Sequence, residues 1–385
     1  MTKKLINLRN YQICMRCVMD TSDPEIIFND DGICNHCINA IEVLKKSPQG
    51  LSSVEKDEAL NNLIKQVKKQ GEGKKYDCVI GISGGIDSSY LAFLVRQWGL
   101  RPIVVHYDNH WDSEIAKQNV DNICRILGFE KKEIVVDWEE FKDLQLSFLK
   151  ASTPDSEVPS DNGIFAALID TARKYNIKYI LSGQNISSES ILAKSWSQGT
   201  YDETYIKTVQ RKFGKIKKIS LRILSSWDIT KNIRFHGIKI IRTLYYVDYN
   251  REQAKALVAN ELEWKDYGRK HGESTYTRIF QEYILPVKFG IDKRRAHYSS
   301  LIVAGQMTRD DAIKKLSEPL YTDESIQYDI DILCNKFDIT RDDFQKIMNF
   351  PVKSINDYNT NEKTLRYKLI GMVRYFLRPF RKIEI

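Results

Sequence analysis

The chain has 385 residues, which is enough for two or three domains. Its hydrophobic content of 42% is ordinary for a globular protein, and no apolar run reaches the length of about 18 residues that a membrane span needs. The net charge of +8 permits an anionic substrate but does not demand nucleic acid. No apolar signal core follows Met1, so we expect a cytoplasmic protein.

Four of the seven cysteines form a C-x2-C-x16-C-x2-C pattern near the N-terminus. In a reducing compartment this spacing predicts a closed, structural zinc site with four thiolate ligands rather than two disulfides. His36 remains an alternative to one of the four ligands. The predicted ligands are Cys14, Cys17, Cys34 and Cys37.

The residues after this module alternate between short apolar strands and helices. A polar, helix-favouring stretch from Ser52 to Lys75 comes first. Strands are predicted at Cys78–Ile82, Pro102–Tyr107, Glu133–Val136 and Tyr179–Ser182. Buried strands alternating with helices predict an α/β fold with a parallel sheet covered on both faces.

A glycine-rich turn, SGGIDSS, directly follows the first strand. Its N–H groups, its hydroxyls and the N-terminus of the next helix can bind a phosphate chain, which the glycines allow to approach closely. It lacks the Lys of G-x-x-x-x-G-K-[ST] and is not G-x-G-x-x-G. The pattern resembles the pyrophosphate loop of the ATP-pyrophosphatase superfamily. We predict that ATP phosphates contact Ser83, Gly84, Gly85, Ser88 and Ser89.

Asp87 carries the negative charge of this turn and has two possible roles. It can hold Mg²⁺ beside the polyphosphate, or it can cap the helix. In either case Mg²⁺ is needed to neutralise the departing pyrophosphate.

Polar side chains also follow the second and fourth strands, at the edge of a parallel sheet where ligands bind. The resemblance to the superfamily implies nucleotide contacts there, with Asn109 facing ribose or substrate and Glu189 helping to hold metal. His110 is as well explained by a loop cap. The predicted nucleotide contacts are His106, Asp108, Gly183, Gln184 and Asn185.

Basic groups are concentrated between residues 271 and 297, interleaved with buried-type residues such as Phe280 and Phe289. This mixture indicates a pocket rather than a solvated face, and an anionic leaving group or nucleotide-linked sugar needs such donors. Catalytic roles are predicted for Lys288, Lys293 and Arg294 together with Asp87. Substrate contacts are predicted for His271, Glu273, Arg278, Arg295 and His297.

From about Asp248 onward the pattern turns helical, with helices expected at 251–263, 274–283, 294–303, 309–316 and 341–349. The basic, aromatic tail from Arg366 to Lys382 favours a solvated helix docked by its aromatics, with a membrane surface or a partner as alternatives. We predict a zinc module at 1–45, a helical connector at 46–75, a nucleotide-binding domain at 76–250 and a helical substrate or partner region at 251–385.

Taken together, the motifs resemble the N-acetyl sugar amidotransferases of bacterial lipopolysaccharide and surface-polysaccharide biosynthesis. The resemblance covers nearly the whole chain. It rests on the segments Cys14–Pro24, Cys34–Cys37, Ser83–Tyr90, His106–Glu114, Gly183–Asn185, Trp264–Thr275 and Leu285–Arg309. His271-Gly272 and Ser274-Thr275 depart from the His-His and Arg expected there.

The resemblance implies a fold like that of the adenine nucleotide α-hydrolases and an amidination reaction. ATP would adenylate the carbonyl oxygen of an acetamido group on a nucleotide-linked sugar, and ammonia would then displace AMP to leave an acetamidino group. No Cys lies in a turn suited to a glutaminase nucleophile, and position 2 is Thr. A separate glutaminase subunit, similar to that of the histidine-pathway pair, is therefore implied.

Three other functions remain open. A tRNA-thiolating enzyme would also combine CxxC motifs with this loop, but it usually needs a catalytic Cys, and Cys78 and Cys124 lie in a strand and a helix. A zinc-ribbon scaffold with a degenerate nucleotide domain conflicts with the intact loop. A ligase of the asparagine-synthetase or NAD-synthetase type differs only in substrate.

Overall fold

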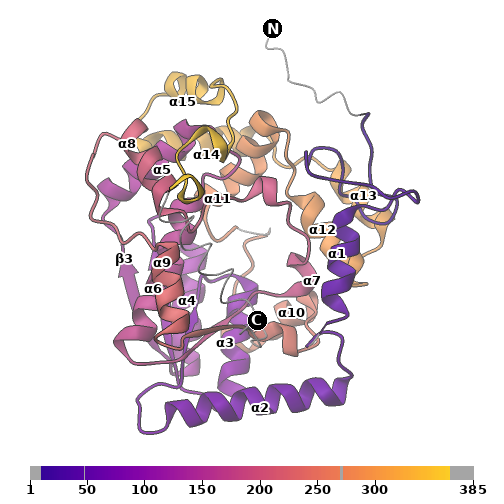
Figure 1. The fold of residues 1–385 in the computed structure, drawn as a ribbon, viewed down its shortest axis with the longest axis vertical. Helices are drawn as coiled ribbons and strands as arrows, with labels where there is room; N and C mark the ends of the chain where they lie inside the picture. The colour runs from indigo at the N-terminus through magenta and orange to yellow at the C-terminus, as the bar shows by residue number, and fades with distance from the viewer. Residues whose placement is uncertain (1–9, 47, 269–271, 365–385) are drawn as a thin grey trace.

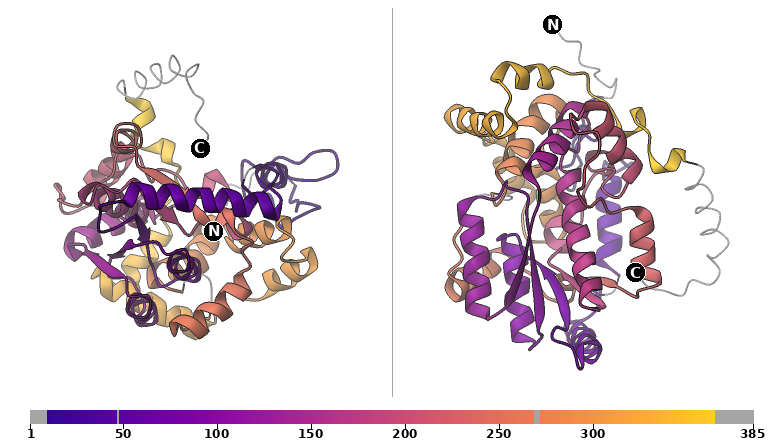
Figure 2. Two further views of the ribbon diagram at one scale, coloured as in Figure 1. Left: turned by 90° about the horizontal axis from the view of Figure 1, so that it is seen from below. Right: turned by 90° about the vertical axis from the view of Figure 1, so that its left-hand side faces the viewer.

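A computed structural model describes residues 10–46, 48–268 and 272–364. Its centre is a five-stranded, entirely parallel sheet in the order β3-β2-β1-β4-β5 (Figures 1 and 2). The strands are β1 (Cys78–Gly81), β2 (Pro102–Asp108), β3 (Glu130–Val135), β4 (Tyr179–Ser182) and β5 (Lys239–Arg242). The predicted α/β class with a parallel sheet is confirmed.

Both faces of the sheet are buried, as parallel sheets require. Alternate residues of β1 enter different clusters: Cys78 and Ile80 pack on one face and Val79 on the other. The first face is covered by α2 (Ser53–Gly71), α3 (Ile86–Gln97), α4 (Glu114–Leu127) and α10 (Arg251–Leu262). The second face is covered mainly by α6 (Val158–Lys174).

A second core joins segments from the two ends of the chain. The four N-terminal cysteines pack in one apolar cluster with Phe280, Ile284 and Leu333 from the C-terminal part. Figure 1 shows α1 beside α12 and α13 on the right of the molecule, and α14 and α15 at the top. The helices of this part are α1 (Asn35–Leu44), α11 (Thr275–Ile279), the π-helical segment Phe280–Phe289, α12 (Arg294–Val303), α13 (Arg309–Ser317), α14 (Asp323–Phe337) and α15 (Arg341–Met348).

The remaining helices connect the two cores. Helix α5 packs on α8, and Tyr358 from the C-terminal part closes this small cluster. The four apolar clusters each draw on separated segments of the chain. The predicted division into four domains stays a prediction. The bounds are α5 (Trp138–Ala151), α7 (Ile186–Glu189), α8 (Glu203–Phe213) and α9 (Ser226–Arg234).

Several predicted elements differ in detail from the structure. The third strand begins at Glu130, three positions before the predicted start, and the structure adds β5, which was not predicted. The helix expected at 274–283 is a short α-helix that continues as a π-helical segment containing Pro286. Proline removes an N–H from the α-helical ladder, which favours the wider turn.

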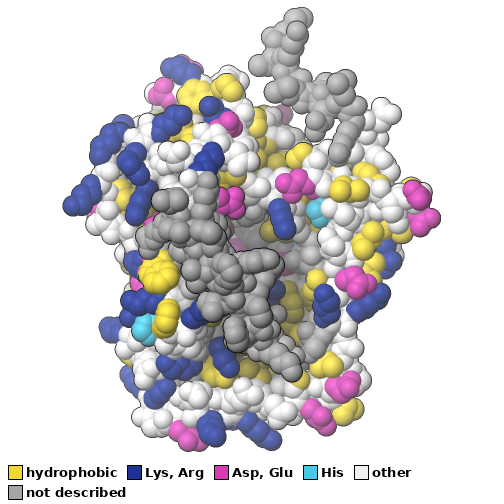
Figure 3. Space-filling view, in the orientation of Figure 1, with side chains coloured by type: hydrophobic (Ala, Val, Ile, Leu, Met, Phe, Trp, Pro, Cys, Tyr) yellow, Lys and Arg dark blue, Asp and Glu magenta, His cyan; other side chains and the backbone are white. Residues whose placement is uncertain are grey.

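The surface carries its charges unevenly on the face in Figure 3, where Lys and Arg gather on the left around α8 and α9. In the described residues, no helix is long and apolar enough to cross a membrane. The basic tail from Arg366 to Lys382 lies outside the described residues.

Candidate nucleotide site and thiolate cluster

The glycine-rich turn joins β1 to α3 and aims the N-terminus of α3 along the edge of the sheet. Gly85 is the N-cap of α3, and no side chain caps the first N–H groups. The hydroxyls of Ser83 and Ser88 lie 3.4 Å apart, and Ser83 Oγ accepts a hydrogen bond from Gly85 N. Uncapped N–H groups beside two hydroxyls are suited to phosphate oxygens. The hydroxyl of Ser89 is buried and donates to Gly85 O, so it braces the turn from within.

Gly84 adopts a conformation that only glycine supports at low cost. Its φ is +77°, and an added Cβ would lie 2.5 Å from the carbonyl oxygen of Ala116. Its own carbonyl accepts hydrogen bonds from the indole of Trp264 at 2.8 Å and from Asn119 Nδ2 at 3.3 Å. Contacts from α4 and from the segment that follows α10 therefore support the turn.

Asp87 lies in the first turn of α3 and accepts a hydrogen bond from the hydroxyl of Tyr249. Burial of the phenol and the charge of Asp87 raise the pKa of Tyr249, so the phenol stays a donor. Glu189, exposed at the end of α7, adds weakly to this rise in pKa. One carboxylate oxygen of Asp87 is thus fixed by Tyr249, an arrangement that leaves the other for a cation or for the helix end.

The turn after β4 packs directly on the glycine-rich turn Ser83–Ser89, which we call the phosphate turn. An added Cβ on Gly183 would lie 3.0 Å from the carbonyl oxygen of Asp87. Asn185 is the N-cap of α7, and its Oδ1 accepts hydrogen bonds from the N–H and hydroxyl of Ser188. Among the described residues the buried Nδ2 of Asn185 has no acceptor, which a bound oxygen atom would supply. Gln184 is exposed at the same edge.

At the end of β2, the side chain of His106 has its partners within the protein. His106 is buried, its Nδ1 lies 3.0 Å from Ile82 O, and its Nε2 lies 3.1 Å from Asp112 Oδ2. Burial opposes the charged imidazole, but the hydrogen bonds to Asp112 and Ile82 raise the pKa of His106. Both ring nitrogens therefore have protein partners, an arrangement that ties β1 to β2.

The residues of the turn that follows β2 also form hydrogen bonds within the protein. Asp108 Oδ1 accepts from His110 N at 2.6 Å, and Asn109 Nδ2 donates to Ser160 Oγ at 3.0 Å. His110 has a φ of +65° and its Nε2 lies 3.0 Å from Val136 O, which fits the loop-cap interpretation.

Residues 272–275 run alongside this turn through main-chain contacts. Ser113 N donates to Glu273 O at 2.7 Å, and Thr275 N donates to Trp111 O at 2.9 Å. A Cβ on Gly85 would lie 3.4 Å from the hydroxyl of Tyr267 and 3.6 Å from Glu273 Oε1. Glu273 and Tyr267 therefore cover the phosphate turn, while His271 lies outside the described residues.

Most basic groups of the 278–297 block have acceptors within the protein. Arg278 forms a bidentate pair with Asp329, Lys288 Nζ donates to Ile347 O, and Arg294 pairs with Asp292 and donates to carbonyls at the end of α13. Burial lowers the pKa of Lys288 to about 8. Arg295 binds the N-terminal module, and His297 Nδ1 lies 3.3 Å from Ser188 O. The geometry gives these groups structural partners; the catalytic roles predicted for Lys288 and Arg294 and the substrate contacts predicted for the others stay predictions.

Lys293 lies among carboxylates at the N-terminus of α6. Its Nζ is 3.6 Å from Glu157 Oε2, and its charge also acts on Asp155 and Asp161. Burial raises the pKa of Asp155 to about 6 and raises that of Asp161 well above its usual value. Lys293 therefore has Glu157 as a partner within the protein, and its predicted catalytic role stays a prediction.

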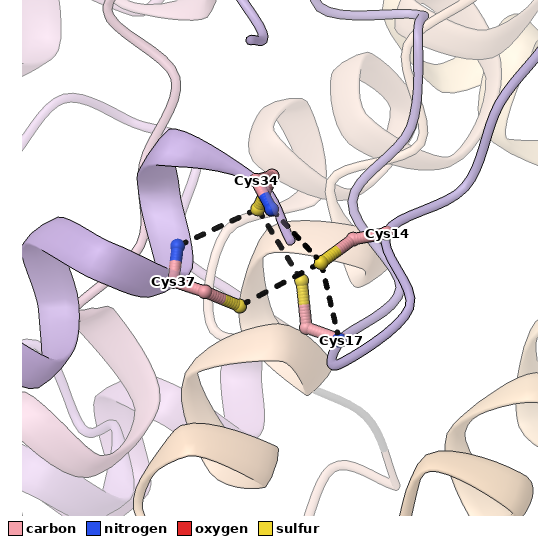
Figure 4. Close-up of side chains that lie close together, drawn as sticks. All are labelled: Cys14, Cys17, Cys34 and Cys37. Atoms are coloured by element: carbon pink, nitrogen blue, oxygen red, sulfur yellow. Dashed lines mark hydrogen bonds between the residues drawn. The ribbon is translucent and has the colours of Figure 1, made fainter. Parts of the chain in front are cut away.

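The four N-terminal cysteines converge on one point (Figure 4). The sulfur atoms of Cys14 and Cys37 lie 3.9 Å apart and those of Cys17 and Cys34 lie 3.8 Å apart, while all four lie within 4.8 Å of one another. Four thiolates on one tetrahedral ion at about 2.3 Å would be separated by about 3.8 Å. His36, the alternative ligand, instead contacts Asp23 at 2.6 Å. The cluster fits a single tetrahedral metal ion.

Sequence reasoning missed the residues that hold the phosphate turn in place. Tyr249, Trp264, Asn119 and Tyr267 reach the turn from outside its own segment. Trp264 and Tyr267 fall within the motif Trp264–Thr275, so that motif was the available signal. Tyr249 and Asn119 belong to no motif, and only the fold brings them to the turn.

Comparison with known families matches residues 273–374 to a family described as LPS biosynthesis protein WbpG-like, C-terminal domain. The resemblance to surface-polysaccharide enzymes that the motifs predict is confirmed by this match.

Curated relatives match over shorter stretches. A tRNA-specific 2-thiouridylase of Fusobacterium nucleatum is 30% identical over 118 residues, which are 29% of this chain and 34% of that protein. A probable tRNA sulfurtransferase of Clostridium perfringens is 26% identical over 32% of each chain. An uncharacterised protein of Methanocaldococcus jannaschii is 26% identical over 45% of this chain and 59% of its own length. The chain thus spans between a third and three-fifths of these relatives.

Solved structures with a related arrangement are distant. An NMN synthetase from Francisella tularensis has 16% identity and a TM-score of 0.36, covering 71% of this chain and 99% of its own. The U34-tRNA thiolase NcsA from Methanococcus maripaludis, with its [4Fe-4S] cluster, has 16% identity and a TM-score of 0.32, covering 68% and 82%.

Proposed function

We propose that the protein is the synthetase subunit of an ATP-dependent amidotransferase, because residues 273–374 match the WbpG-like family of lipopolysaccharide biosynthesis. Its substrate would be a nucleotide-linked N-acetyl sugar, whose acetamido group becomes an acetamidino group. The observation that carries the proposal is the phosphate turn, with a helix N-terminus that no side chain caps beside the buried Nδ2 of Asn185, which has no acceptor among the described residues. Such a turn suits a triphosphate whose α-phosphate must be attacked.

The proposed reaction has two steps. The amide oxygen of the sugar attacks the α-phosphate of ATP, the bond to the β-phosphate breaks, and pyrophosphate leaves. Ammonia then adds to the activated carbon and AMP departs with the former amide oxygen. A proton is released, and nitrogen replaces the oxygen on the carbon. An amide is a poor electrophile until its oxygen becomes a leaving group, which explains why ATP is consumed.

Residues of this chain would bind and orient the reactants. Ser83, Ser88 and the N–H groups at the start of α3 hold the phosphates, and Asn185 Nδ2 donates to an oxygen of the nucleotide. Asp87 would hold Mg²⁺, which neutralises charge on the departing pyrophosphate. Tyr249 fixes the carboxylate of Asp87 for this purpose. Tyr267 and Glu273 cover the turn and help to exclude water from the activated intermediate.

We further propose Zn²⁺ as the ion held by the four thiolates, in a structural role. The short separations of the sulfur atoms support one ion, since the thiolates of a [4Fe–4S] cluster bind separate iron atoms and spread further apart. Metal analysis by mass spectrometry checks this assignment, and iron with acid-labile sulfide would contradict it.

Ammonia would come from a separate glutaminase subunit. All seven cysteines of the chain are described and buried, so a glutaminase nucleophile is not at hand among them. Burial also raises the pKa of Cys124 to about 11 and raises that of Cys78, which disfavours their thiolates.

A second candidate is a tRNA-thiolating enzyme, since two of the curated relatives carry such names. That chemistry usually needs a reactive thiolate near the adenylated base, and the buried state of Cys78 and Cys124 disfavours it. Incubation with ATP, Mg²⁺, ammonium and a panel of UDP- or CMP-linked N-acetyl sugars separates the two candidates. We expect AMP to form only with one sugar, whose mass falls by about one unit. AMP that forms only with added tRNA would favour the alternative.

A further inference from the structure

The segment that joins α12 to α13 contacts both the thiolate cluster and Tyr249, the residue that bonds Asp87 of the phosphate turn. It spans Gly305 to Arg309, the GQMTR motif of the sequence, and ends on the first residue of α13; no catalytic step above uses it. Figure 1 shows it on the right of the molecule, where α12 packs against α7, α1 and α13. One short segment therefore connects two sites that lie far apart in the sequence.

Arg309 contacts the N-terminal module through the backbone of two metal ligands. Its Nε donates to Cys17 O at 3.1 Å and to Cys14 O at 3.3 Å, and its Nη2 donates to Cys14 O at 3.1 Å. These carbonyls belong to the C-x2-C knuckle, whose shape a bound ion would fix. The guanidinium can make these bonds together only when the knuckle adopts this shape.

Helix α12 adds three further contacts to the same knuckle. Arg295 Nη1 donates to Val18 O at 2.9 Å, its Nε lies 3.0 Å from Asp20 Oδ2, and Ser299 Oγ accepts from Val18 N at 3.2 Å. Val18 directly follows Cys17, and Asp20 lies two positions further along. The knuckle is thus bonded to the start of α13, and the residues just after it are bonded to α12.

The opposite end of this segment reaches the nucleotide site. Gln306 Nε2 donates to the carbonyl oxygen of Tyr249 at 2.7 Å, and the hydroxyl of Tyr249 donates to Asp87. Ser300 of α12 accepts from Ile191 N at 2.9 Å, just beyond α7 and its N-cap Asn185. Both groups assigned to the nucleotide, Asp87 and Asn185, are therefore supported from α12 and the segment after it.

We propose that Arg309 is a positioning residue that couples the metal cluster to the ATP site. When the thiolates hold their ion, the knuckle fixes Arg309, and Gln306 then places Tyr249 against Asp87. The inference rests on the proposed use of ATP. By thermodynamic linkage, metal must then strengthen ATP binding and ATP must strengthen metal binding by the same factor.

A purely structural role for Arg309 would have a different consequence. It would change the thermal stability of the protein without altering the affinity of the folded protein for MgATP. The discriminating quantities are therefore the metal content, the dissociation constant for MgATP and the temperature of unfolding, measured on the same preparations of the full chain.

The test compares the variants Arg309→Met and Arg341→Met with the wild type. Arg341 is a matched control because its guanidinium pairs with Asp331 and Gln327 at the surface, with no contact to either site. We expect R309M to keep its metal but to bind MgATP about tenfold more weakly in calorimetry, and R341M to match the wild type in both. Equal MgATP affinities for folded, metal-loaded wild type and R309M would overturn the coupling.

A second measurement needs no variant. A chelator is titrated into the wild-type protein with and without MgATP, while metal release is followed with a chromogenic dye. We expect MgATP to raise the chelator concentration needed for half-release by about tenfold. Unchanged release would overturn the coupling but leave the proposed reaction intact. A wild-type protein that binds no MgATP at all would overturn both.

Discussion

The phosphate turn and the basic block at residues 278–297 are two regions for which the sequence predicts ligand-binding donors, and their donors have different partners in the structure. The donors of the turn contact mostly one another, and the first N–H groups of α3 lack a capping side chain. The donors of the basic block are bonded to Asp329, Asp292 and backbone carbonyls. Donors without protein acceptors mark a binding site, whereas donors already paired within the protein mark its scaffold.

The largest expected effect concerns Asp87, the carboxylate of the turn. Asp87→Asn removes the charge that would hold Mg²⁺ in the proposed reaction, so AMP formation should fall by at least about 100-fold while the content of the thiolate-bound metal stays the same. Asp266→Asn is the matched control, because Asp266 pairs with Lys255 near the surface and does not contact the turn. Unchanged AMP formation in D87N would leave only the helix-capping role.

Gly84 tests whether the close approach of α4 fixes the shape of the turn. Gly84→Ala combines a φ of +77° with a Cβ 2.5 Å from Ala116 O, so it should destabilise the protein by about 2–4 kcal/mol. Gly73→Ala has a similar φ of +72° but open space around the Cβ, and should cost only about 1–2 kcal/mol. Urea unfolding measures both. Equal losses would mean that the close approach to α4 does not matter.

The carboxyl cluster around Lys293 predicts a pH dependence. Asp155 has a folded pKa of about 6, above the ordinary value, so the folded state holds its proton more tightly than the unfolded chain does. The resulting stabilisation is complete below about pH 4 and is lost as the pH rises to about 6, at about 1.4 kcal/mol per pKa unit. The stability of wild type relative to Asp155→Asn should therefore decline over this interval. A difference that does not change with pH would contradict the raised pKa.

The smallest expected effect is that of Arg294, whose donors are bonded to Asp292 and to the end of α13. Arg294→Met should lower thermal stability slightly and leave the KM for ATP unchanged, because the guanidinium has structural partners. A rise in KM without loss of stability would support the catalytic role that the sequence predicts for Arg294.

The sequence was most informative where local rules apply. The turn after Cys78–Gly81 and the two C-x2-C knuckles depend on glycine conformation and on ligand spacing, and both are found in the structure as expected. The basic block was harder, because the sequence shows Arg278 but not its partner Asp329, 51 positions away. The same limit applies to Tyr249, whose bond to Asp87 joins residues 162 positions apart. Long-range pairing decides whether a charge is free for a ligand, and periodicity does not report it.

The proposed function requires that this chain activates an amide oxygen as an adenylate. The most direct test supplies a nucleotide-linked sugar whose acetamido oxygen is labelled with ¹⁸O, together with ATP, Mg²⁺ and ammonium. We predict that the label is transferred to AMP and that the sugar product carries none, because the amide oxygen departs with the adenylate. Unlabelled AMP formed alongside a product that retains the label would contradict the account.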